Sequence, residues 1–145
     1  MPMNPVIHFE LPCRDRERIG RFYASAFGWK LQFLGPEMGH YTVVTTSDPG
    51  APPPAPPGAV PGSINGGFFI ADAHMPAQHP GIVIGVEDLR AAMVRVAQAG
   101  GSVLGEPMDI PGVGAYVAFT DTEGNRCSLL QPLPSFSGEA APCAS

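Results

Sequence analysis

The sequence predicts an α+β fold made of two tandem modules, each with the element order strand, helix, strand, strand, strand. Two observations predict it: a repeat with a constant offset, and the same succession of strand-like and helix-like patterns in both copies. The first helix pattern runs from Asp15 to Gly28 and the second from Asp88 to Gly101, so the second copy lies 73 positions after the first at both ends. This agreement at both ends indicates an internal duplication.

The first copy begins with the strand-like run Val6–Leu11 and continues into an amphipathic helix. Asp15 is a suitable N-cap, and Gly28 suits the turn that ends a helix. Between them, apolar residues recur at helical spacing on one face: Ile19, Phe22, Tyr23, Ala26 and Phe27. Three strand-like runs follow, at Lys30–Leu34, His40–Thr46 and Ser63–Ile70.

The second copy repeats this order. The strand-like run Gly81–Val86 precedes a helix that Asp88 caps and that the pair Gly100-Gly101 ends. The apolar face of this helix consists of Leu89, Ala92, Met93, Val96 and Ala97. Strand-like runs follow at Ser102–Leu104, Gly114–Thr120 and Arg126–Gln131. The Gly and Asn content of residues 121–125 predicts a hairpin turn before the last strand.

We expect a single domain over residues 1–145, with repeat one at about 5–70 and repeat two at about 81–132. Residues 51–62 form a proline-rich insertion within repeat one. Because proline has no amide hydrogen to pair in a sheet, we expect a polyproline-like surface loop there. Residues 133–145 form a tail with little periodicity.

The composition excludes several classes of partner. Lys and Arg number 8 against 13 Asp and Glu, and a net charge of −5 argues against a nucleic-acid or acidic-membrane partner. No apolar run approaches the roughly 20 residues that a membrane span requires. The N-terminus lacks signal-peptide features, and three unpaired cysteines suit a reducing compartment, so we predict a cytoplasmic protein. High Ala, Arg, Gly and Pro with a single Lys suggests a GC-rich bacterial genome.

Alternation along the first strand assigns its residues to two faces. Three apolar side chains would meet the helix: Ile7, Phe9 and Leu11. His8 and Glu10 then lie on the opposite, concave face. One interpretation is a histidine satisfied by a backbone group or by Glu10; the other is a metal ligand or general acid/base that Glu10 orients. Cys13, beside Arg14, is interpreted as a packed cysteine rather than a reactive one.

The later strands add residues to the same concave side. Val117, Phe119, Cys127 and Leu129 would pack inward, which leaves Tyr116, Ala118 and Ser128 on the concave face. We expect the two modules to form curved mixed sheets around a concave cleft, the usual place for a small ligand. Within repeat one, Gly66-Gly67 interrupts a strand, which predicts a bulge or the close approach of another group.

These residues resemble the vicinal oxygen chelate superfamily, which contains glyoxalase I, bleomycin- and fosfomycin-resistance proteins and extradiol dioxygenases. The first repeat is similar through His8, Asp15, Phe22-Tyr23 and Phe27-Gly28-Trp29. The second is similar through Val86–Leu89, Gly100-Gly101, Pro111–Gly114, Asp121–Asn125 and Gln131. The resemblance covers about residues 5–132, is nearest to small glyoxalase-like members, and implies a homodimer.

The resemblance also implies where a divalent metal would be held. Family enzymes use His, Gln or Glu at equivalent strand positions of the two repeats, which correspond here to His8, Gly81 and Ser128. The remaining position falls near Gly66-Gly67, which offers no ligand. Glycine has no donor, and a neutral serine is a poor substitute for a carboxylate. A catalytic metal needs about three protein ligands, so we predict that the usual metal site is absent and that no cofactor is bound.

The sequence therefore predicts a small-molecule-binding protein of the bleomycin-resistance type, with a degenerate metal site. The ligand would contact His8 and Glu10 in the cleft, together with four further residues: Trp29, Tyr116, Ala118 and Ser128. The alternative is a lactoylglutathione-lyase-like lyase or isomerase, or a dioxygenase, that uses His8 and Glu10 with a divalent metal. A third hypothesis is a module that only dimerises or serves a partner protein.

Overall fold

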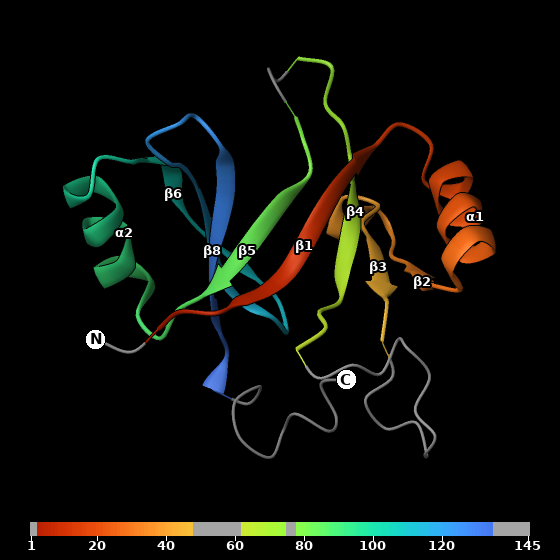
Figure 1. Cartoon of the computed structure of the whole chain (residues 1–145), viewed down its shortest axis with the longest axis horizontal. Helices are drawn as coiled ribbons and strands as arrows, with labels where there is room; N and C mark the ends of the chain where they lie inside the picture. Colours follow the sequence, from red (N-terminus) through yellow and green to blue (C-terminus); the bar gives the residue numbers. More distant parts are fainter. Residues whose placement is uncertain (1–2, 48–61, 75–77, 135–145) are drawn as a thin grey trace. The chain divides into compact units, whose positions relative to one another are not determined.

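The computed structural model describes residues 3–47, 62–74 and 78–134 (Figure 1). The predicted α+β fold is confirmed: strands and α-helices follow one another as two βαβββ modules in a mixed sheet. The chain divides into two compact units, which are His8–Pro80 (the first unit) and Met1–Ile7 with Gly81–Ser145 (the second unit). Most of the predicted insertion 51–62 and tail 133–145 lies outside the described residues.

The first unit holds the elements of repeat one. They are β1 (Val6–Cys13), α1 (Arg16–Phe27), β2 (Lys30–Phe33), the short 3-10 helix η1 (Pro36–Met38), β3 (Thr42–Thr45) and β4 (Gly66–Ile70). The strands are hydrogen-bonded in the order β2-β3-β4-β1, with β1 parallel to β4 and the other pairs antiparallel. The helix packs on one face, over a core centred on Cys13, Val44 and Phe68.

Helix α1 begins and ends as predicted, but its buried face differs. Asp15 Oδ1 accepts a hydrogen bond from Arg18 N at 3.0 Å, and Gly28 has a left-handed φ of 74°. Phe22 and Phe27, expected in the core, are 57% and 62% exposed. Gly20 is buried so close to β2 that a Cβ there would lie 2.6 Å from Leu31 Cδ1, so the Gly20 side of the helix faces the sheet. Phe22, about 200° around the helix from Gly20, therefore points away from the sheet. Phe27 is the last residue of the helix, and the contact at Gly20 does not explain its exposure.

The second unit holds β5 (Gly81–Gly85), α2 (Leu89–Gln98), β6 (Ser102–Ile110), β7 (Gly114–Thr120) and β8 (Arg126–Pro132). The strand order is β5-β8-β7-β6, with β5 parallel to β8 and the other pairs antiparallel. Strand β6 is longer than the predicted run. Its sequence alternation breaks at Gly105, which has a φ of 84°, and the register with β7 shifts between Leu104 and Met108, so the part of the strand after Gly105 carries no continuous pattern in the sequence. Figure 1 shows α1 beside β2 and α2 beside β6.

The core of the second unit lies between α2 and its sheet. Its buried residues are Val86, Leu89, Ala92, Val117, Phe119 and Leu129. Two side chains satisfy amides in the first turn of α2: Asp88 Oδ1 accepts from Ala91 N at 3.0 Å, and Gln131 Oε1, from β8, accepts from Leu89 N at 2.8 Å. Gln131 therefore ties the start of the helix to the sheet. In the described part of the chain, no helix is long and apolar enough to cross a membrane.

We expect Gln131→Met to destabilise the protein by about 1 to 2 kcal/mol, because it removes the acceptor for the amide of the buried Leu89 while keeping the side-chain volume. Urea unfolding followed by circular dichroism measures the effect. Gln98→Met, at the exposed end of the same helix, is the control and should change the free energy of unfolding by less than about 0.5 kcal/mol. Equal unfolding midpoints for both variants would contradict the capping role of Gln131.

Candidate functional site

Alternation along β1 places His8 and Glu10 on the sheet face opposite α1. Phe9 and Leu11, between and beyond them, pack into the core with the helix, as predicted. The same logic applies at the start of β3, where Thr42 and Val44 are fully buried. Tyr41 therefore lies on the face that carries His8 and Glu10.

Tyr41 joins His8 and Glu10 through its hydroxyl group. The Tyr41 Oη atom lies 2.8 Å from His8 Nε2 and donates a hydrogen bond to Glu10 Oε2 at 3.0 Å. All three side chains are half-buried. The rings of His8 and Tyr41 are inclined by 20°, with centroids 6.4 Å apart. The prediction that Glu10 orients the imidazole is thus modified, since Tyr41 connects the two.

The direction of these hydrogen bonds specifies the tautomer of His8. A phenol has one proton, and Tyr41 gives it to the Glu10 carboxylate. At the other contact the phenol oxygen must accept, so Nε2 of His8 carries the hydrogen. Burial lowers the pKa of His8 below its ordinary value of 6.5, so the ring is neutral at pH 7. The lone pair of the neutral imidazole is then on Nδ1.

Gly67 makes room for Tyr41. It pairs with Glu10 on β1 and with Val43 on β3, so the phenol ring crosses β4 at this residue to reach Glu10. A Cβ at Gly67 would overlap the ring and hydroxyl of Tyr41. Gly66 serves the opposite face, since a Cβ there would lie 2.6 Å from the ring of Phe9. The predicted close approach at this glycine pair is therefore confirmed on both faces.

Three predicted ligand-lining residues lie together in the second unit. Ser128 is buried, and its Oγ donates a hydrogen bond to Tyr116 Oη at 2.7 Å. Ala118 is the register partner of Ser128 across the β7–β8 pair and is also buried. Their neighbours Val117, Phe119 and Leu129 pack against α2, which confirms the predicted division of these strands into two faces.

Trp29 lies elsewhere. Its ring stacks on Tyr23 of α1, with centroids 4.6 Å apart and planes inclined by 10°, and contacts Phe9 at 5.6 Å. These contacts place Trp29 in the aromatic part of the core between α1 and the sheet, and the structure does not bring it to His8 and Glu10. Cys13 is also packed: burial, and then the nearby Asp15, raise the pKa of its thiol, so it is not an activated thiolate.

The donor groups do not fit a divalent metal. Among the residues that the structure describes, no three His, Cys, Asp or Glu side chains lie close enough together to hold one. Nε2 of His8 is committed to Tyr41, the Ser128 hydroxyl to Tyr116, and Gly81 has no side chain. A catalytic metal requires about three protein donors and an open position.

A family model described as Glyoxalase/Bleomycin resistance protein/Dioxygenase superfamily matches residues 6–129. The chain belongs to this superfamily. The resemblance found in the sequence is therefore confirmed over both modules.

Curated relatives of this superfamily protein carry similar descriptions. It is 31% identical over 121 residues to "Glyoxylase-like domain-containing protein" of Didymella fabae, which covers 83% of this chain and 88% of that protein. It is also 39% identical over 56 residues to "Putative glyoxylase CFP32" of Mycobacterium tuberculosis. That match covers 39% of this chain and only 22% of the mycobacterial protein. The chain thus matches less than a quarter of that relative's length.

Solved structures of the superfamily have the same fold at low identity. Methylmalonyl-CoA epimerase from Mycobacterium tuberculosis has a TM-score of 0.63 at 15% identity, covering 92% of this chain and 91% of that chain. A variant of the Streptomyces coelicolor epimerase in complex with 2-nitronate-propionyl-CoA has a TM-score of 0.62 at 14% identity, covering 90% and 99%. A superfamily member from Vibrio splendidus has a TM-score of 0.57 at 14% identity, covering 89% and 99%. At these identities the likeness shows the fold.

We expect Gly67→Ala to destabilise the protein by about 2 to 3 kcal/mol, because the new methyl group must displace Tyr41. In a Tyr41→Ala background the same change should cost less than about 1 kcal/mol, since the obstacle has been removed. Urea unfolding of the four proteins in this cycle measures the coupling. Gly81→Ala, a strand glycine whose Cβ would approach only Arg126 O, at 3.2 Å, is the control. If the effects of Gly67→Ala and Tyr41→Ala on the free energy of unfolding are additive, the proposed packing of Tyr41 over Gly67 is wrong.

The lowered pKa of His8 predicts a pH dependence of stability. The folded protein holds this proton more weakly than the unfolded chain, so the contribution of His8 is fully present above about pH 6.5 and is lost as pH falls toward the lowered pKa. The free energy of unfolding of the wild type should therefore fall more steeply over this window than that of His8→Gln. His79→Gln, which changes an exposed histidine, should keep the wild-type slope. Parallel curves for wild type and His8→Gln would exclude the effect.

Proposed function

We propose that this superfamily member binds a small organic molecule without a metal ion, at the face of the first unit that carries His8, Tyr41 and Glu10. The observation that supports this proposal is the hydrogen-bonded chain of these three side chains. Such polar groups are usually satisfied when they are partly buried. Within the described residues, however, His8 has no hydrogen bond besides the one at Nε2. Its Nδ1 is therefore the atom offered to a ligand.

The chemistry of Nδ1 specifies what the ligand must present. A neutral imidazole nitrogen without hydrogen is an acceptor, so the matching ligand group is a hydroxyl or an N–H. A ligand anion at this position would face both the Nδ1 lone pair and the neighbouring Glu10 carboxylate, which disfavours it.

A second candidate function is proton transfer in an isomerase or lyase reaction, which the lowered pKa of His8 favours. A neutral imidazole at pH 7 can take a proton at Nδ1. The resulting positive charge would be stabilised by Glu10 through the Tyr41 hydroxyl, two hydrogen bonds away. No metal enters this step, because the donor set does not fit one.

Further expectations accompany the proposal. A ligand contact at Tyr116, Ala118 and Ser128 of the second unit remains a prediction, as does one at Trp29. We also propose a homodimer, as the resemblance implies, a cytoplasmic location, from the cysteine content, and a bacterial source, from the high Ala, Arg, Gly and Pro with a single Lys. Ligand sequestration of the bleomycin-resistance type is the biological role that a binding protein without catalytic metal would serve.

The metal-free protein should bind phenol, which donates a hydrogen bond, at least about 3-fold more tightly than anisole, which has no donor. Titrations followed by nitrogen-15 spectra of labelled histidine measure both affinities, because a hydrogen bond accepted by Nδ1 of His8 shifts the resonance of that nitrogen. The same spectra should show the Nε2–H tautomer of His8 in the wild type and a loss of this preference in Tyr41→Phe. The exposed His79 is the internal control and should not respond.

Elemental analysis completes this test. Untagged protein and the His8→Ala variant are incubated with zinc, nickel, manganese and iron, and are then desalted. We expect far less than one metal per chain in both. About one metal per chain that is lost in His8→Ala would overturn the metal-free proposal, and equal binding of phenol and anisole would overturn the role of Nδ1.

A further inference from the structure

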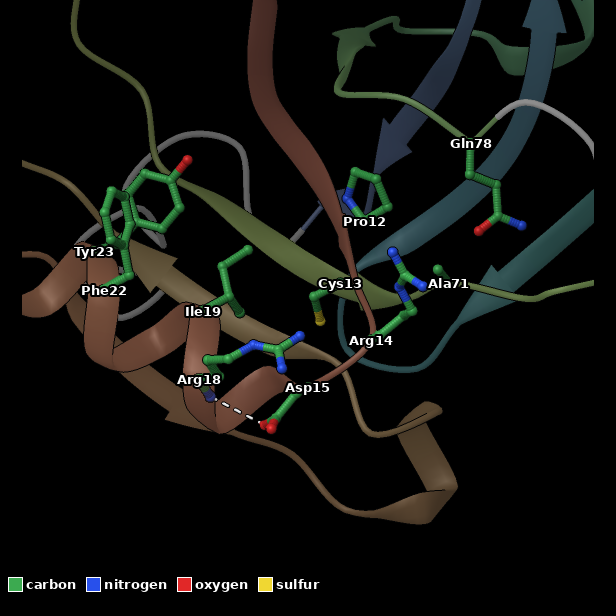
Figure 2. Close-up of a pocket in the computed structure, with 10 residues that line it drawn as sticks. All are labelled: Pro12, Cys13, Arg14, Asp15, Arg18, Ile19, Phe22, Tyr23, Ala71 and Gln78. Atoms are coloured by element: carbon green, nitrogen blue, oxygen red, sulfur yellow. Dashed lines mark hydrogen bonds between the residues drawn. The ribbon is translucent and has the colours of Figure 1, made fainter.

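A pocket lies in the first unit, where β1 ends and α1 begins (Figure 2). It has a volume of about 550 Å³, within the range of about 300 to 1,000 Å³ typical of small-molecule sites. Figure 2 shows the aromatic rings of Phe22 and Tyr23 on one side, Gln78 on the other, and the side chains of Arg14 and Arg18 between them. His8, Glu10 and Tyr41 are not among its lining residues, so it is separate from the face described above.

In the described part of the chain, no carboxylate forms an ion pair with Arg14 or Arg18 of the pocket. Within the described ranges, neither the Arg14 nor the Arg18 side chain forms an ion pair or a hydrogen bond. Asp15 is the acidic residue of the pocket, and its Oδ1 is engaged by the backbone amide of Arg18 as the cap of α1. The pocket therefore keeps a net positive charge and two exposed guanidinium groups.

The charge pattern of the whole chain makes this local excess unusual. Five of its 8 basic residues lie between positions 14 and 30, and this segment contains only 2 of its 13 acidic residues. One of the five, Arg16, has a structural task, since its Nη1 donates to Leu34 O at 2.7 Å and to His40 O at 2.8 Å. Arg14 and Arg18 have no such task. A basic pocket in an acidic protein attracts anions selectively.

The side of the pocket next to the core is apolar. Ile19 and Tyr23 line the pocket from the core side, and Cys13 contributes a buried thiol that its raised pKa keeps neutral. Phe22 is 57% exposed and meets Tyr23 edge to face, with ring centroids 5.0 Å apart. An exposed aromatic ring that is already held by a neighbour offers a flat surface to a ligand at little cost in side-chain entropy.

We propose that this pocket binds a small organic anion, in which a carboxylate or phosphate group is attached to an apolar or aromatic body. The guanidinium groups of Arg14 and Arg18 bind the anionic oxygens, because their planar N–H groups match both carboxylate and phosphate geometry. The body of the ligand packs against Phe22 and Ile19. The pocket thereby takes a class of ligand that the Nδ1 and carboxylate groups of the His8 face disfavour.

The test is a titration of the full-length protein with 2-naphthoate, 2-naphthyl phosphate and the neutral 2-naphthamide, followed by amide chemical shifts. We expect saturable binding of at least one of the two anions, with shifts around residues 12–23. The neutral amide should bind at least about 5-fold more weakly, and binding of the anion should weaken as salt is raised. The ratio of the two anions shows whether carboxylate or phosphate is preferred.

Variants locate the site. Arg14→Gln and Arg18→Gln should each weaken binding of the anion by about 3-fold or more, whereas Arg21→Gln, the same charge change elsewhere on α1, should change it by less than 2-fold (about 0.4 kcal/mol). Phe22→Ala should weaken naphthoate binding but leave inorganic phosphate unaffected. Because Arg14, Arg18 and Phe22 are exposed, these variants keep the fold, which their amide spectra verify.

Three results would overturn the proposal. They are the absence of saturable binding at millimolar concentration, equal affinity for 2-naphthamide and the anions, and equal effects of Arg14→Gln, Arg18→Gln and Arg21→Gln. These results are independent of the proposed function of the His8 face. The phenol test measures the Nδ1 resonance of His8, and the arginine variants do not change that residue.

Discussion

The absence of side chains at Gly66 and Gly67 allows two aromatic rings to approach the same strand from opposite faces. On the helix side Phe9 occupies the space above Gly66 and connects the core of the first unit to Trp29. On the other side Tyr41 crosses Gly67 and reaches Glu10 and His8. The core and the polar chain therefore depend on one dipeptide, and the backbone of β4 is the surface against which both are placed. A larger residue at either position would alter the fold and the site together.

Much of the fold could be predicted from the sequence because the two copies carry the same local signals. Asp15 and Asp88 cap their helices in the same way, and strand alternation assigned His8, Glu10, Tyr116 and Ser128 to the face away from the helices. Strand pairing could not be deduced from such signals, and this is why Tyr41 was missed. Alternation within residues 40–46 already separates Tyr41 from the buried Val44, but nothing local shows that β3 lies two strands from β1, across glycine.

Helical periodicity gave a less accurate result than strand alternation. It grouped Phe22 with Ile19 and Tyr23, whereas the helix approaches the sheet most closely at Gly20, about 200° around the helix from Phe22. This error concerns a proposed site as well, because Phe22, which helical periodicity assigned to the core, lines the basic pocket. Trp29, an aromatic residue for which a ligand contact remains a prediction, stacks on Tyr23 in the structure. The choice between core and site depends on tertiary contacts that a single sequence does not display.

Strand β1 belongs to both units, and this has a consequence for how the chain folds during synthesis. The amide of Gly85 donates a hydrogen bond to Pro5 O at 2.9 Å, so Pro5, directly before β1, finds this partner 80 positions later in the chain. While the ribosome is still extending repeat one, the segment from His8 onward has its neighbours, but Pro5 does not have this partner. It lacks this hydrogen bond until β5 emerges, a delay of several seconds at about 5 to 20 residues per second. The hydrogen bond at the start of β1 is thus completed only after the second copy has begun to emerge.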